Sequence, residues 1–216
     1  MIWRSAFATL IWAAGPVAAC DTALMLAIDV SNSVDVAEYR LQVDGLADAL
    51  VDPEIVAAMV KGQVAIAIMQ WSGADRQVLT TDWVQIRTAV DATDLSLAAR
   101  TTPRAITLSD TAPAEAIYFA LDQLARAPDC RRDVIDISGD GTPNAGTDAQ
   151  LARNLAQTSG VTINGIAIEG MGRAISAYYR NALITRDGFV VTAGGHRDYH
   201  AAIRDKLLRE LTVGIG

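Results

Sequence analysis

The stretch ALMLAIDVSNS, residues 23–33, is the part of the chain that most directly indicates its fold. Its first six residues form a continuous apolar run, which is typical of a β-strand buried on both faces. Asp29 ends the run, and the hydroxyl side chains of Ser31 and Ser33 follow at alternate positions. Strands of this kind occur in parallel sheets covered by helices, and ligands bind beyond the carboxyl ends of such strands. Residues 29–33 are therefore the first candidates for a functional site.

The rest of the chain alternates between strand-like and helix-like segments. Further strands are expected at residues 64–71, 76–81 at the sheet edge, 133–137, 161–168 and 189–192. Helices are expected at residues 38–50, 84–90, 112–125, 147–158, 174–183 and 198–211, whereas 93–109 follows no regular pattern. This alternation predicts an α/β fold, a doubly wound and mostly parallel six-stranded sheet with helices on both faces.

Length and composition agree with one large domain. The chain has 216 residues, of which 51% are apolar, enough for a single core. The net charge is −7, so the chain lacks the basic surplus expected of a protein that binds nucleic acid. We therefore expect no nucleic-acid partner.

The first nineteen residues resemble an export signal. Arg4 is their only charged residue, an apolar stretch covers 6–14, and small residues lead up to Ala19. This pattern predicts a signal peptide at residues 1–19 and a mature domain at 20–216, in the periplasm or secreted. The alternative is a buried first helix.

The sequence contains two cysteines, Cys20 and Cys130. They precede Asp29 and Asp140 by nine and ten residues, which places both near the amino ends of two expected strands. In an exported protein this spacing favours a disulfide. The alternative is lipidation of Cys20, since residues 17–20 also satisfy a loose lipoprotein cleavage pattern. Only that alternative would give the chain a membrane contact.

Two further oxygen donors are expected near Asp29. Asp140 follows the strand at 133–137 in the Gly-rich turn 138–141, and Thr111 stands at the start of a predicted helix as its N-cap. With Asp29, Ser31 and Ser33 they supply five oxygen side chains from three turns. Small hard cations such as Mg²⁺ prefer oxygen ligands and use few carboxylates, so this set predicts a divalent-cation site.

The motif Asp29-Val30-Ser31-Asn32-Ser33 resembles the metal-ion-dependent adhesion site of von Willebrand factor A-type domains, which have a Rossmann-like fold. Thr111 and Asp140 fall where that family has its second-loop threonine and third-loop aspartate. Residues 132–141, 161–168, 178–179 and 189–191 resemble more narrowly an uncharacterised exported bacterial subfamily of these domains.

The resemblance implies a role for each site residue. Ser31 and Ser33 would coordinate Mg²⁺, or Mn²⁺ or Ca²⁺, directly. Asp29 and Asp140 would act mostly through water, and Thr111 would do either. A protein or peptide partner would supply a carboxylate to the ion, and the domain would not be an enzyme.

The sequence departs from the family pattern at two places. Ser138-Gly139 precedes Asp140 where many relatives have a threonine, and Asp110 precedes Thr111 where a glycine is common. Ser109 and Thr107 therefore remain alternatives to Thr111.

Two other functions stay open, a metal-dependent α/β hydrolase that uses Asp29 and Asp140, and a degenerate scaffold without metal. We expect no histidine near the site loops, and this argues against the hydrolase. His196 and His200 share the spacing of a zinc-binding pair but are expected on the surface of the last helix. Tyr178 and Tyr179 are expected to pack in the core or to form a contact platform near the site.

Overall fold

The computed structural model describes residues 19–170 and 172–212. The expected signal peptide lies outside the described residues, apart from Ala19. Among the helices of the described part, none is long and apolar enough to cross a membrane.

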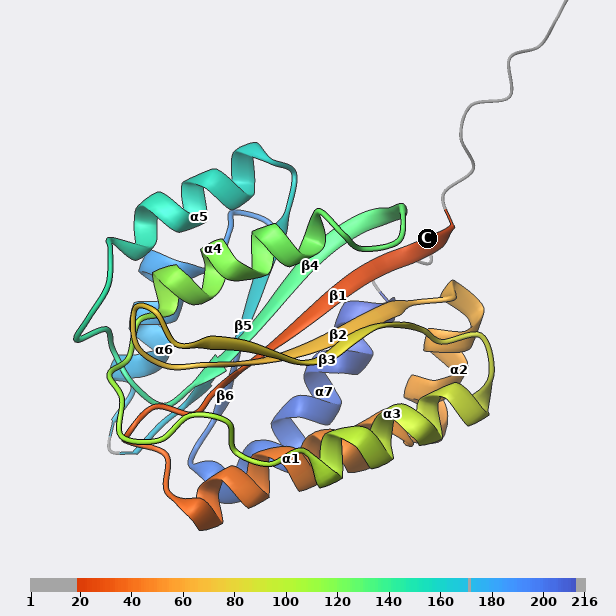
Figure 1. The fold of residues 1–216 in the computed structure, drawn as a ribbon, viewed down its shortest axis with the longest axis horizontal. Helices are drawn as coiled ribbons and strands as arrows, with labels where there is room; N and C mark the ends of the chain where they lie inside the picture. The colour runs from red at the N-terminus through yellow and green to blue at the C-terminus, as the bar shows by residue number, and fades with distance from the viewer. Residues whose placement is uncertain (1–18, 171, 213–216) are drawn as a thin grey trace, which may run out of the picture.

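A single six-stranded sheet forms the centre of the molecule, with the strand order β3-β2-β1-β4-β5-β6 (Figure 1). The strands are β1 (Cys20–Asp29), β2 (Ala65–Trp71), β3 (Gln77–Gln85), β4 (Cys130–Gly139), β5 (Thr162–Ile168) and β6 (Val190–Ala193). All neighbours pair in parallel except β2 and β3, which are antiparallel. The expected fold class is therefore confirmed, including the edge position of the third strand.

Helices cover both faces of the sheet (Figure 1). One layer contains α1 (Val36–Leu50), α2 (Pro53–Gly62), α3 (Ala89–Thr101) and α7 (Tyr199–Thr212), which follows the 3-10 turn η2 (His196–Asp198). The other contains α4 (Pro113–Leu124), α5 (Ala149–Thr158), α6 (Ala174–Tyr178) and the π-helical turn η1 (Tyr179–Leu183).

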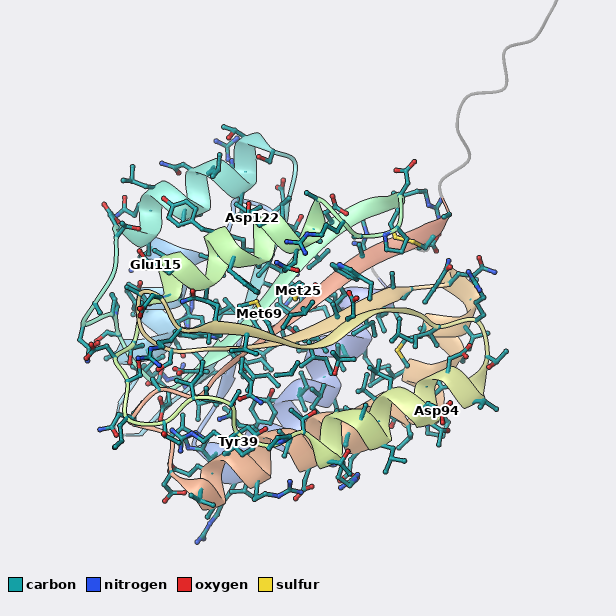
Figure 2. All side chains as sticks on the ribbon, viewed as in Figure 1. Met25, Tyr39, Met69, Asp94, Glu115 and Asp122 are labelled. Atoms are coloured by element: carbon teal, nitrogen blue, oxygen red, sulfur yellow. A yellow bond between two sulfur atoms is a disulfide. The ribbon has the colours of Figure 1, made fainter. Side chains whose placement is uncertain are left out.

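Side chains of β1 alternate between the two layers. Leu24 and Leu26 belong to the core beneath α1 and α7, whereas Met25 belongs to the core beneath α4 and α5. Figure 2 shows Met25 and Met69 between the sheet and α4. Every residue of β1 is wholly or largely buried, as the apolar run predicts, and this includes Asp29 at its carboxyl end.

The region after β3 differs from the sequence prediction. The expected helix at 84–90 is wrong, because Val84 and Gln85 continue β3 by pairing with Ile66 and Ala65 of β2. The helix begins instead after Thr88, whose side chain caps it.

The segment 93–109 is expected to be irregular, but its first part, up to Thr101, belongs to the helix α3. Its buried face consists of Ala92, Leu95, Ser96 and Ala99. This face is made mostly of small residues, so the apolar periodicity is weak. The helix α2 was not predicted either, although the Asp52 side chain accepts hydrogen bonds from two backbone N–H groups of its first turn.

Cys20 and Cys130 form a disulfide at the amino ends of β1 and β4, with their Cα atoms 4.5 Å apart. Of the two alternatives for Cys20, the structure has the disulfide.

Candidate metal centre

The carboxyl ends of β1 and β4 adjoin in the sheet, so the turns that follow them converge at one end of the molecule, on the left in Figure 1. Three connections meet there. We call them the first loop (residues 30–35), the second loop (102–112) and the third loop (140–148).

Four of the five expected site residues form one continuous chain of hydrogen bonds. The Asp29 Oδ1 atom accepts from the Ser31 backbone N–H at 2.7 Å. The Ser31 and Ser33 Oγ atoms lie 3.1 Å apart, and Ser33 Oγ donates to Asp140 Oδ1 at 2.5 Å. Residues 107 positions apart in the sequence therefore meet at one point.

The Thr111 hydroxyl completes the set. A Cβ atom placed on Gly141 would lie 3.5 Å from Thr111 Oγ1 and 3.9 Å from Ser33 Oγ, so both hydroxyls border the same small space. Of the alternatives to Thr111, the Ser109 hydroxyl lies away from this space, since it accepts from the Gly73 N–H.

Thr111 does not cap α4, contrary to expectation. The N-cap residue is Ala112, and within the described chain no side chain makes the capping hydrogen bond. The backbone of Thr111 instead joins the second loop to the third, because its N–H donates to Asn144 Oδ1 at 2.8 Å and its carbonyl accepts from the Asn144 N–H at 3.1 Å. The hydroxyl is thus left free to face the site.

The Asp29 carboxylate is fully buried, and its Oδ2 atom has no hydrogen-bond partner in the described part of the chain. Burial raises the pKa of Asp29 to about 7, and the nearby charge of Asp140 adds to this, although hydrogen bonds from Ser31 oppose it. A buried carboxylate oxygen without a partner is costly. A hard cation would satisfy it, so the donor set and the orphaned oxygen both fit a divalent metal ion.

Arg104 is a site residue that the sequence prediction missed. Its guanidinium donates to the backbone carbonyls of Val30 and Ser31 at 2.8 and 3.0 Å, which holds the first loop in place from the second. Arg104 lies in the segment expected to be irregular, and no motif marks it.

His196 also lies at the site, which corrects the expectation that no histidine would. Its Nε2 atom lies 3.8 Å from Asp140 Oδ2, and its side chain is only 9% exposed. The turn η2 before α7 carries it there. His200 matches the expectation better, because its side chain is 57% exposed and faces Asp48.

Tyr179 packs beneath the site. It is buried, and a Cβ atom on Gly139 would lie 2.7 Å from both its hydroxyl oxygen and Asp29 Oδ2. Burial raises the pKa of the Tyr179 phenol well above its usual value, and the Asp29 charge adds to this.

A model of the family described as "Protein of unknown function (DUF1194)" matches residues 19–214, nearly the whole chain. The chain belongs to this family. A comparison of the chain with curated proteins found no match.

Solved structures of low sequence identity share its fold. Proximal thread matrix protein 1 from the mussel byssus has a TM-score of 0.66 at 16% identity, over 88% of this chain and 48% of that protein. A second structure of that protein, described as having a zinc-occupied MIDAS motif, has a TM-score of 0.65 at 17% identity, over 89% and 46%. The present chain thus spans about half the length of the mussel protein.

A third match has nearly the same length as this chain. It is the von Willebrand factor domain of the type V pili tip protein Mfa5 from Porphyromonas gingivalis, with a TM-score of 0.64 at 12% identity, over 91% of this chain and 97% of that one. The chain therefore has the von Willebrand factor A-type fold, as the resemblance in the sequence implied.

Proposed function

We propose that the protein is an exported, cation-dependent protein-binding domain of the adhesion type. Asp29, Ser31, Ser33, Thr111 and Asp140 hold one Mg²⁺ ion, for which Mn²⁺ or Ca²⁺ can substitute. When bound, the ion offers a coordination position to a carboxylate of a protein or peptide partner.

The observation that carries this proposal is the buried Asp29 carboxylate. Its Oδ2 atom has no partner among the described residues, and its Oδ1 atom is joined through Ser31 and Ser33 to Asp140. Oxygen donors with only two carboxylates suit Mg²⁺, which keeps several waters. The chain's own groups determine how such a site is held. Arg104 fixes the first loop, and the Thr111 backbone fixes the second loop against the third.

Two observations support export. Disulfides persist in oxidising compartments, and the chain has one between Cys20 and Cys130. Similar solved structures include a byssus matrix protein and a pilus tip protein, which act outside cells by their descriptions.

The rim of the site offers a surface for a partner. Leu108 is 88% exposed, more than any other large apolar side chain among the described residues. With Asn32, Ser109 and Asp110 it lines a hollow of about 220 Å³ next to the first loop. An apolar group beside the partner's carboxylate would fit there.

Calorimetric titration of Mg²⁺ tests the metal site. We expect the wild type to bind one Mg²⁺ per chain and Asp29→Ala to bind none. Asp94→Ala is the control, because Asp94 is an exposed carboxylate on α3, away from the site loops (Figure 2). Equal Mg²⁺ affinity in the wild type and in Asp29→Ala would refute the site. A wild type that binds no Mg²⁺ would leave the degenerate scaffold.

A pull-down with the immobilised protein tests partner binding. We expect capture in Mg²⁺, release by a chelator, and loss of capture in Ser31→Ala. Leu108→Ser should weaken capture without changing Mg²⁺ affinity. Capture that persists with chelator would contradict a role for the ion.

The hydrolase remains a second candidate function because His196 lies beside Asp140. Metal-dependent ester or peptide hydrolysis that Asp140→Ala abolishes would favour that function over binding. We expect no such turnover.

A further inference from the structure

Three side chains of types that can bind metal ions come together from separate elements next to the first site. Glu38 lies in the first turn of α1, Asp140 in the third loop and His196 in η2. One ligand atom of each residue lies within 4.8 Å of one atom of both others. The His196 Nδ1 atom is 3.2 Å from Glu38 Oε1, and its Nε2 atom is 3.8 Å from Asp140 Oδ2.

Each carboxylate of this cluster is held by one oxygen and presents the other to the imidazole. Glu38 Oε2 accepts from the Asp35 N–H at 2.8 Å in the capping box of α1, which leaves Oε1 facing His196. Asp140 Oδ1 accepts from Ser33, which leaves Oδ2 facing His196. Both donor oxygens therefore lie beside the same imidazole ring, Glu38 Oε1 next to Nδ1 and Asp140 Oδ2 next to Nε2.

The imidazole supplies an independent sign of a missing ligand. Its side chain is 9% exposed, and Nε2 is buried without a hydrogen-bond partner among the residues that the structure describes. Both ring nitrogens of a buried histidine normally have partners. Nε2 points instead toward a carboxylate oxygen that lies too far away for a hydrogen bond.

We propose that Glu38, Asp140 and His196 form a second ion site, specific for a divalent transition metal of the Zn²⁺ type. Imidazole is a preferred ligand of such metals, whereas Mg²⁺ and Ca²⁺ prefer oxygen donors alone. Donors at about 2.0–2.2 Å from a tetrahedral Zn²⁺ lie roughly 3.4 Å from one another. Ligand atoms that now lie within 4.8 Å of one another must therefore approach by up to roughly 1.4 Å. Three protein ligands leave a position for water.

The two ion sites share Asp140 and are otherwise separate. Asp140 Oδ1 faces Ser33 in the first site, and Oδ2 faces His196 in the second, so the carboxylate can bridge two ions. Asp29 belongs only to the first site, and Glu38 and His196 belong only to the second. The second site does not rest on the proposed binding function, and single substitutions distinguish the two.

Equilibrium dialysis of the purified full-length chain against Zn²⁺ in excess Mg²⁺ tests this proposal. We expect about one Zn²⁺ per wild-type chain, and a weakening of Zn²⁺ binding on the order of 10–100-fold or more in His196→Ala and Glu38→Gln. Glutamine can still make the capping box, so Glu38→Gln spares α1. His200→Ala is the matched control and should bind Zn²⁺ like the wild type.

Two further measurements distinguish the second ion site from the first. Asp29→Ala should lose Mg²⁺ and retain Zn²⁺, whatever the result of the partner pull-down. Co²⁺ should give the intense visible absorption bands of a four-coordinate ion in the wild type and only weak bands in His196→Gln. Circular dichroism confirms that each variant is folded. Zn²⁺ binding that survives His196→Ala, or that Asp29→Ala abolishes, would overturn the proposal, as would a wild type that binds no Zn²⁺ in excess Mg²⁺.

Discussion

Among single residues, Gly139 determines how closely β4 approaches the Asp29 carboxylate. A Cβ atom at position 139 would lie 2.7 Å from Asp29 Oδ2 and 2.7 Å from the Tyr179 hydroxyl oxygen. Both neighbours are fully buried and have little freedom to move. A side chain at this position would therefore displace the carboxylate from the site.

We predict that Gly139→Ala lowers Mg²⁺ affinity on the order of 10–100-fold, the cost of disturbing the support of a metal ligand. The control is Gly170→Ala, because a Cβ atom there would meet no described atom within 4 Å. Calorimetric titration of both variants measures the difference. Equal affinities would show that the carboxylate adapts.

The residues of the site differed in how far the sequence could predict them. Asp29, Ser31 and Ser33 lie within five residues, so a local pattern is enough to select them as candidates. Asp140 followed from the rule that neighbouring parallel strands end together. Arg104 and His196 reach the site from loops whose paths depend on tertiary packing, and no local pattern marks either residue.

Among the elements, α7 is anchored to the sheet by a buried charge cluster. Lys206 is fully buried, and its Nζ atom lies 2.5 Å from Asp136 Oδ2 on β4 and 2.6 Å from Glu210 Oε2. Asn164 on β5 donates to the other Glu210 oxygen at 2.7 Å. The cluster thus fixes the helix against two central strands.

We predict that Lys206→Met destabilises the protein by about 3–5 kcal/mol above pH 7, where Asp136 is ionised, because it leaves two buried carboxylates without a cation. The chain has one other lysine, Lys61, which is exposed, so Lys61→Met is the matched control and should have little effect. Urea unfolding measures both. A small effect of Lys206→Met would mean that the carboxylates take up protons at little cost.

The same cluster predicts a pH dependence. Burial raises the pKa of Asp136 from 3.8 to about 7, with Glu210 adding to the shift and Lys206 opposing it. The folded chain therefore holds a proton between about pH 4 and about pH 7 that the unfolded chain has released. The resulting stabilisation is complete below the unfolded pKa and is lost as the pH rises through the folded one.

We therefore expect the free energy of unfolding to fall with rising pH over this interval, and to fall less steeply in Asp136→Asn. Asparagine keeps the shape of the side chain without titrating. Urea unfolding at several pH values measures both slopes. Identical slopes would show that Asp136 stays ionised beside Lys206.

Long apolar elements were predicted well, and elements made of small residues were not. Buried strands such as β1 and β2 show as continuous apolar runs. The buried face of α3 consists largely of alanine and serine, which hardly differ in polarity from a loop. The boundary between β3 and α3 was misplaced because pairing with β2, a tertiary interaction, extends the strand to Gln85.

For the molecule as a whole, the disulfide and the site lie at opposite ends of the same two strands. Cys20 and Cys130 pair at the amino ends of β1 and β4. Asp29 is the last residue of β1, and Asp140 directly follows β4. The disulfide closes a loop across 110 positions of the sequence. Its effect on stability should therefore be separable from metal binding.

We predict that replacing both cysteines by serine lowers the free energy of unfolding by up to about 4.7 kcal/mol, the value for a loop of about 100 residues in the chain-entropy model. Mg²⁺ affinity of the folded variant should stay within about twofold, because additivity holds for distant sites. Urea unfolding and calorimetry measure the two quantities. A large loss of Mg²⁺ affinity would show that the strands transmit strain.

The backbone hydrogen bonds that join the three loops also bear on the order of events during biogenesis. Asn32 N–H bonds to the Ser109 carbonyl, and Asn144 N–H to the Thr111 carbonyl, so segments over a hundred residues apart must already be assembled before the cradle exists. The proposed ion site can therefore form only after all three loops have folded together. Ion uptake at that site should follow folding of the domain and not precede it.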